Sequence, residues 1–189
     1  MAQHELAWDK VAITLTDERQ VPAEHERSNA RLLRENFLEK CQVGEFIPLF
    51  CGQTDEVALR NTTTRLQEHC LPLDVCVVGM GTDGHFASLF PAARQLAAGL
   101  DPDNPAALIV VTADHIPEPR LSLTLAAILT APHIHLLITG EEKHAVLEQA
   151  RKAAEAGTRA ADAAHQLPDL PIQTLIEQAG ERLSIHYAA

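Results

Sequence analysis

The stretch Leu73-Asp-Val-Cys-Val-Val-Gly79-Met-Gly-Thr-Asp-Gly-His85 decides the fold class that we expect. Its first six residues are almost all apolar, which is typical of a strand that is buried on both faces of a parallel sheet. The strand runs into a glycine-rich turn, where the backbone can approach a ligand closely. In open α/β sheets the ligand site lies beyond the carboxyl ends of the strands. The turn 79–85 is therefore the first candidate for a functional site.

The segments on either side of this stretch alternate between strand and helix patterns. Strands are expected at 11–16, 108–112, 134–139 and 183–187, with an edge segment at 46–50, and helices at 30–38, 55–70, 123–131, 141–156 and 171–178. This alternation predicts the α/β class: an open, mostly parallel, Rossmann-like sheet with helices on both faces. No repeat or linker is found, so residues 1–189 are expected to form a single domain.

The composition narrows the classes of partner and location. Of the 189 residues 46% are hydrophobic, and the net charge of −11 repels nucleic acids and anionic lipid surfaces. No apolar run approaches the roughly 20 residues that cross a bilayer, and the N-terminus lacks the pattern of a secretory signal. The cysteines have no zinc spacing and are expected to be free thiols in a reducing compartment: Cys41, Cys51, Cys70 and Cys76. We therefore expect a cytoplasmic protein with no nucleic-acid or membrane partner.

The glycines of the turn match the dinucleotide-binding pattern Gly79-x-Gly81-x-x-Gly84. That pattern requires a long helix directly after the glycines and an acidic residue at the end of a second strand ~20 residues later. Here Pro91 ends any helix within two turns, and the residues near 99–105 have the composition of a loop. The match therefore does not predict a dinucleotide site.

Asp83-Gly84-His85 carries the residues for acid–base chemistry. An imidazole is the natural proton acceptor near neutral pH, and a nearby carboxylate can fix its tautomer. The alternative is a tight turn with an incidental surface histidine. The position of Asp83-Gly84-His85 at the carboxyl end of a strand that is expected to be buried favours a catalytic His85 assisted by Asp83. The amide groups of Gly79 and Gly81 are further candidates for binding an anion.

Charged residues also follow other expected strands. Asp17-Glu18-Arg19 comes directly after the first strand, and Arg120 lies in a proline-bearing loop. Lys143 lies in the first helical turn after Gly140, where the helix dipole disfavours a cation unless an anion such as phosphate binds there. The alternatives are a solvated turn for residues 17–19 and a plain surface lysine at 143.

One pair of histidines could suggest a metal site. His133-x-His135 places two imidazoles on one face of an expected strand, but no third ligand is evident nearby. We therefore predict no metal site.

Four ordered segments carry a resemblance to a known family. They are Trp8–Pro22 with Ser28-Asn29, Leu73–Pro91, Pro119–Thr124 and Gly140–Lys143. Together they resemble the 6-phosphogluconolactonases, which are related to glucosamine-6-phosphate deaminases and isomerases. The deaminases typically continue Asp-Gly-His with an apolar residue, Ala, Phe and Asn-Glu-Pro. This chain has Phe86-Ala-Ser-Leu-Phe-Pro91 and is more similar to the lactonase branch.

The resemblance implies a hydrolase of carbohydrate metabolism. The implied reaction is hydrolysis of 6-phospho-D-glucono-1,5-lactone to 6-phosphogluconate in the pentose phosphate pathway, without a metal or organic cofactor. His85 would be the base, and Asp83 would hold the imidazole or the water. The residues expected to bind the phosphosugar lactone are Asp17, Arg19, Gly79, Gly81, Arg120 and Lys143, with Arg120 and Lys143 clamping the phosphate.

The chain departs from the family pattern at its start. The family's N-terminal strand and helix, with a Ser-Gly-Gly loop that grips the phosphate, are not found, so we expect a shortened sheet with an exposed edge. A monomer or weak homodimer is expected. Two alternative functions stay open: a deaminase or isomerase with Asp17 as its carboxylate base, and a non-catalytic sugar-phosphate-binding domain.

Overall fold

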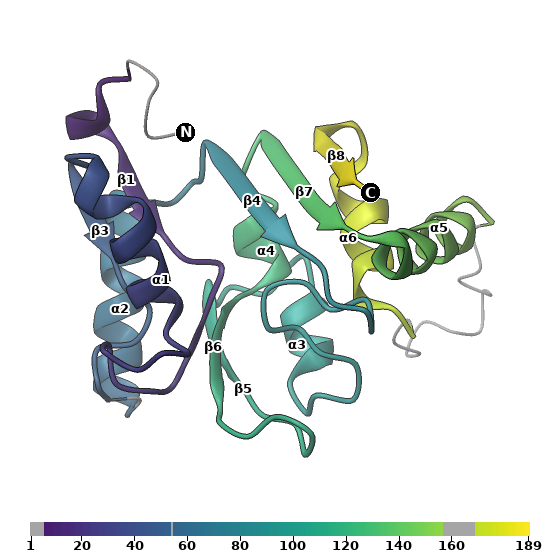
Figure 1. Cartoon of the computed structure of the whole chain (residues 1–189). Coiled ribbons are helices and arrows are strands. Elements are labelled where there is room, and N and C mark those ends of the chain that lie inside the picture. The colour runs from purple at the N-terminus through teal and green to yellow at the C-terminus, as the bar shows by residue number, and fades with distance from the viewer. Residues whose placement is uncertain (1–5, 54, 157–168) are drawn as a thin grey trace.

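The computed structural model describes residues 6–53, 55–156 and 169–189 (Figure 1). The strands form three separate ladders, two of them parallel and one antiparallel. The expected α/β class is confirmed, but the single sheet that we expected is divided. The antiparallel ladder lies between the two parallel ones in Figure 1.

The first ladder pairs β1 (Ala12–Thr14) in parallel with β3 (Glu45–Ile47). Helices α1 (Asn29–Asn36) and α2 (Glu56–His69) lie beside it (Figure 1), with short 3-10 turns at Trp8–Lys10 and Leu38–Lys40. Ser28 caps α1 by accepting a hydrogen bond from the amide of Arg31, as its N-cap position predicts. Asp55 caps α2 in the same way, through the amide of Ala58. Local sequence therefore determines where both helices begin.

The second ladder, in the order β2-β6-β5, corrects two expectations. Residues 17–19, expected in a loop, form β2 (Asp17–Arg19), because β6 (Arg120–Leu123) pairs with them antiparallel. Arg120 is therefore the first residue of a strand and not part of the proline loop. β5 (Leu108–Val111) flanks β6 on its other side. Because Leu123 belongs to β6, the helix is shorter than the expected range 123–131. It is α4 (Leu125–Ile128), and Thr124 caps its N-terminus.

The third ladder has the order β4-β7-β8 and is parallel throughout. Its strands are β4 (Val75–Gly79), β7 (His133–Thr139) and β8 (Leu183–Ala188). The accompanying helices are α3 (Leu96–Leu100), α5 (Glu141–Glu155) and α6 (Pro171–Ala179), and a 3-10 turn at Gly180–Arg182 leads into β8. Among the described helices, none combines the length and the apolar character that crossing a bilayer requires.

One hydrophobic core joins all three ladders. Its fully buried large side chains come from strands, helices and the loop after β4; they include Ile47, Leu49, Leu66, Phe86, Leu89, Leu121, Leu123, Leu125, Ile128, Ile134, Leu136 and Leu147. Each contributes about 1.5–3 kcal/mol by leaving water. The core therefore fixes the carboxyl end of β4 and the beginning of β6 relative to each other, which matters for the site below.

The expectation that β4 is buried on both faces is wrong. Its residues alternate between exposed and buried, and Val75 and Val77 stay 52% and 41% exposed. Leu137 of β7 is 46% exposed and is paired with His186 of β8. Because alternate residues share one face of a sheet, Val75, Val77, Leu137, His135 and His186 lie on the same side. We call this side the open face. Parallel sheets are usually covered on both faces, so the open face is exceptional.

The open face predicts self-association of residues 1–189. Exposed apolar side chains such as Val75, Val77 and Leu137 recruit other chains, and β4 is in addition an edge strand. Val77→Lys should therefore shift the protein toward the monomer, because the new charge would be buried in any such contact. Size-exclusion chromatography with light scattering measures this. Leu32→Lys is the matched control, since Leu32 is 61% exposed on α1, away from the open face. A monodisperse monomer in the unsubstituted chain would contradict the prediction.

Candidate active site

The turn after β4 brings His85 and Asp83 into direct contact. The Nδ1 atom of His85 lies 2.5 Å from the Oδ1 atom of Asp83, and the same oxygen accepts the backbone amide of His85. A carboxylate partner favours a proton on Nδ1, which leaves the lone pair on Nε2. Partial burial alone would raise the pKa of Asp83, but the hydrogen bond and charge of His85 outweigh it, so this pKa lies below its ordinary value. Asp83 therefore stays an anion that orients the imidazole.

Gly81 makes this contact sterically possible. A Cβ at Gly81 would lie 2.3 Å from two ring atoms of His85 and 2.5 Å from the carboxylate of Asp83. The amide of Gly81 donates to the carbonyl oxygen of His85, so it is already used within the turn. The turn also needs Gly84, which has a φ of +76° and packs against Leu170. Residues 80–95 form turns and no helix, unlike a dinucleotide-binding motif.

The loop that follows His85 is anchored by the core. Phe86 and Leu89 are fully buried, and their backbones form an isolated antiparallel bridge. Ser88 between them is also fully buried, and its amide donates a hydrogen bond to the hydroxyl oxygen of Ser122. The apolar anchors on both sides of Ser88 therefore hold the loop rigidly beneath the polar groups of the site.

Phe90 connects His85 to Arg120. The rings of His85 and Phe90 lie 4.4 Å apart, and the guanidinium carbon of Arg120 lies 5.9 Å from the centre of the Phe90 ring. Phe90 is itself 7% exposed. One buried aromatic ring thus separates a histidine from a cation, although their sequence positions are 35 apart. Phe90 lies within the motif 86–91, but the sequence alone indicates no role for it.

Strand pairing places Arg19 directly opposite Arg120. Residues opposite each other in an antiparallel pair project from the same face, so two guanidinium groups lie side by side. Arg120 is 7% exposed, and the Nε atoms of both arginines are buried without a hydrogen-bond partner. Burial lowers the pKa of Arg120 and the charge of Arg19 lowers it further, while Glu118 and Asp17 raise it. Two adjacent cations with unused donors have the chemistry that suits an anionic ligand.

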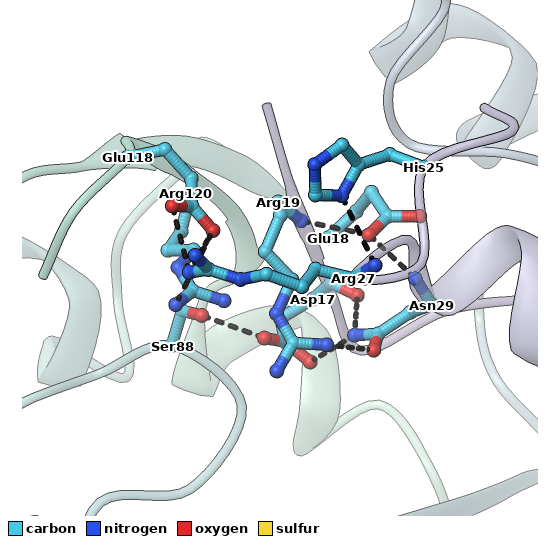
Figure 2. A network of polar contacts seen from close by, with 9 residues as sticks. All are labelled: Asp17, Glu18, Arg19, His25, Arg27, Asn29, Ser88, Glu118 and Arg120. Atoms are coloured by element: carbon cyan, nitrogen blue, oxygen red, sulfur yellow. Dashed lines mark hydrogen bonds and ion pairs between the residues drawn. The ribbon is translucent and has the colours of Figure 1, made fainter. Parts of the chain in front are cut away.

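Asp17 lies on the same face of β2 as Arg19. Its Oδ2 atom accepts a 2.6 Å hydrogen bond from the hydroxyl of Ser88, and its Oδ1 atom accepts one from Asn29 (Figure 2). Asn29 in turn accepts a hydrogen bond from Arg19. The network therefore joins β2, the start of α1 and the loop after β4. In the sequence Asn29 and Ser88 stand out only as members of family motifs, because their partners are distant in the chain.

Glu18 points to the opposite side and is 2% exposed. Its carboxylate accepts hydrogen bonds from the amides of Arg19, Asn29 and Ala30 and from the hydroxyl of Ser28. A buried carboxylate at a helix N-terminus is stabilised by these donors and by the helix dipole. Glu18 is thus a structural group, a role that its charge alone did not predict.

The remaining expected ligands lie outside this network. Lys143 follows Gly140 in the first turn of α5 and is partly buried; its expected phosphate contact stays a prediction. Gly79 ends β4, paired with Leu137, and nothing lies within 3.4 Å of where its Cβ would be. Within the described ranges, no three His, Cys, Asp or Glu side chains are grouped so as to hold a metal ion. His135 instead contacts His186, with 3.0 Å between Nδ1 and Nε2.

Comparisons with known proteins show the family of the chain. A sequence model described as glucosamine-6-phosphate isomerases/6-phosphogluconolactonase matches residues 1–182. The chain belongs to this family. A 6-phosphogluconolactonase from Rhizobium meliloti is 37% identical over all of this chain and 77% of its own length. One from Mesorhizobium japonicum is 44% identical over 77% of this chain, a match that spans 62% of that relative's length.

A solved structure extends the family likeness to the fold. The crystal structure of a 6-phosphogluconolactonase from Shewanella baltica superposes with a TM-score of 0.83 and 30% identity, over all of this chain and 76% of that one. The chain thus spans about three quarters of that family member. The expected resemblance to the 6-phosphogluconolactonase family is confirmed.

Removing the Glu18 carboxylate should strongly destabilise this family member. Glu18→Ala leaves three amides and a hydroxyl buried without their acceptor, which should lower the free energy of unfolding by about 2–4 kcal/mol. Urea denaturation followed by circular dichroism measures the loss. Glu26→Ala, at an exposed position of the preceding loop, is the control and should change it by less than about 0.5 kcal/mol. Equal stability of the two variants would contradict the assigned role.

Proposed function

We propose that this chain hydrolyses 6-phospho-D-glucono-1,5-lactone to 6-phosphogluconate. The observation that carries the proposal is the contact series His85, Phe90, Arg120, which sets a proton acceptor beside a buried cation with an unused donor. A substrate with a reactive carbonyl at one end and a phosphate at the other needs such a pair of groups. The relatives named above are 6-phosphogluconolactonases, which supports the assignment. We also expect the whole protein to act in the cytoplasm.

His85 would act as the general base. A lactone is an activated ester, so a positioned water can attack its carbonyl carbon without a covalent enzyme intermediate. The Nε2 atom would take a proton from this water as the bond to the carbonyl carbon forms. The resulting imidazolium is stabilised by Asp83 through Nδ1. When the bond between the carbonyl carbon and the ring oxygen breaks, the same proton would pass to that oxygen.

Arg120 and Lys143 would bind the phosphate, and Arg19 would stabilise charge at the reacting carbonyl. The buried Nε atoms of Arg19 and Arg120 without partners support roles as ligands. The glycine amides are weaker candidates, since the amide of Gly81 already donates within the turn. The net charge of −11 would repel the substrate, so this local cluster of cations has to supply the attraction.

The alternative isomerase or deaminase activity requires Asp17 as a base. Both carboxylate oxygens of Asp17 already accept hydrogen bonds, which favours a structural or substrate-positioning role. An assay for ammonia released from glucosamine 6-phosphate tests this alternative directly.

His85→Gln should lower turnover of the phosphorylated lactone by about 10²–10⁴-fold, because the base is lost. Folding should be retained, since His85 lies in a partly exposed turn. The rate can be followed as acid release in weakly buffered solution, with circular dichroism as the check on folding. His133→Gln, at an exposed position of β7, is the control. A near-normal rate in His85→Gln would remove this residue from the mechanism.

Lys143→Ala should raise KM for the phosphorylated lactone much more than for unphosphorylated gluconolactone. The reason is that a cation in the first turn of a helix is favoured mainly beside a bound anion. Steady-state kinetics with both substrates measures the difference, and Lys152→Ala, in the last turn of the same helix, is the control. Equal effects on the two substrates would show that Lys143 does not bind phosphate.

A further inference from the structure

Glu118 differs from the other two carboxylates of the network in Figure 2. Glu18 accepts from backbone amides and a hydroxyl, and Asp17 accepts from Ser88 and Asn29. Glu118 interacts instead with two guanidinium groups, those of Arg27 and Arg120. Within the described residues, it is therefore the one carboxylate of this network whose partners are all guanidinium groups.

The two contacts of Glu118 are unequal. The Nη2 atom of Arg27 donates to both carboxylate oxygens, at 2.5 and 2.7 Å, whereas the Nη2 atom of Arg120 lies 3.8 Å away, beyond hydrogen-bond distance. The Glu118 side chain is 15% exposed and that of Arg27 is 42% exposed. Glu118 thus partly neutralises Arg120 without satisfying its donors, while Arg27 has room to move.

We propose that Glu118 is an internal counter-anion that competes with a bound phosphate for Arg120 and Arg27, and that Arg27 is a third cation of the phosphate site. The assignment of phosphate to Arg120 rests on the proposed function. A phosphate dianion offers more acceptor oxygens and more charge than a carboxylate, so it can form the hydrogen bonds to Arg120 that Glu118 does not form. Repulsion from the phosphate then weakens the hold of Glu118 on Arg27, which becomes free to donate to the ligand.

Such competition has a definite consequence for affinity. Every bound phosphate has to displace an existing ion pair, so removal of the competing charge tightens binding. A purely structural role predicts the reverse, because the loss of a support for Arg120 would loosen the site. The sign of the effect therefore separates the two roles.

The test is the binding of inorganic phosphate, measured by isothermal titration calorimetry. Glu118→Gln keeps the size of the side chain and should tighten the Kd about fivefold, the change expected from one partly exposed ion pair of about 1 kcal/mol. Glu118→Asp keeps the charge and should bind nearly as the unsubstituted protein does. Glu26→Gln, beside Arg27 but exposed, is the control for a change in net charge. Arg27→Gln should weaken binding in the unsubstituted and Glu118→Gln backgrounds.

Unchanged or weaker phosphate binding in a folded Glu118→Gln protein would overturn the proposal, and so would an unaffected Kd in Arg27→Gln. The readout does not depend on catalysis. If the lactone is not hydrolysed but Glu118→Gln binds phosphate more tightly, the proposed function fails and the competition stands.

Discussion

The buried carboxylate of Glu18 holds β2 against the N-terminus of α1, and the placement of the polar site follows from this contact. Its acceptor oxygens satisfy three amides and the Ser28 hydroxyl, which offsets the cost of removing a charge from water. With β2 fixed in this way, its pairing with β6 sets Arg19 opposite Arg120. Successive strand residues project to opposite faces, so the same three-residue strand turns Glu18 inward and Asp17 and Arg19 toward the site.

The site keeps like charges together at a cost in free energy. Arg19 and Arg120 repel each other, and Arg120 is also removed from water, as the direction of its pKa shift reflects. Asp17 and Glu118 reduce the repulsion but leave donors unused. An anion that enters relieves both the repulsion and the unsatisfied donors, so the arrangement is prepared for a ligand. The chain has a net charge of −11, so an anionic ligand would be repelled by the protein as a whole. The arginines of the site give this region a positive charge of its own.

The open face and the site are connected through β4. Val75 and Val77 lie on the open face, while the turn that holds Asp83 and His85 starts at the end of the same strand. The inner face of β4 carries Cys76 and Val78 into the core, and burial raises the pKa of the Cys76 thiol to about 12, which keeps it inert. The open face and the turn that holds His85 therefore belong to one strand and the segment that directly follows it.

The sequence by itself determined the elements that depend on local chemistry. The apolar run before Gly79, the N-cap Ser28 and the glycines of the turn predicted β4, the start of α1 and the place of His85. Each of these signals involves residues near one another in the chain. Only the tertiary structure decided the rest. It made residues 17–19 a strand, paired Arg19 with Arg120, turned Glu18 into a helix anchor and left one face of β4 uncovered. Those outcomes depend on partners up to about a hundred residues away. The local pattern of a charged tripeptide or of a valine-rich strand is the same with or without such a partner, so the sequence alone does not predict the outcome.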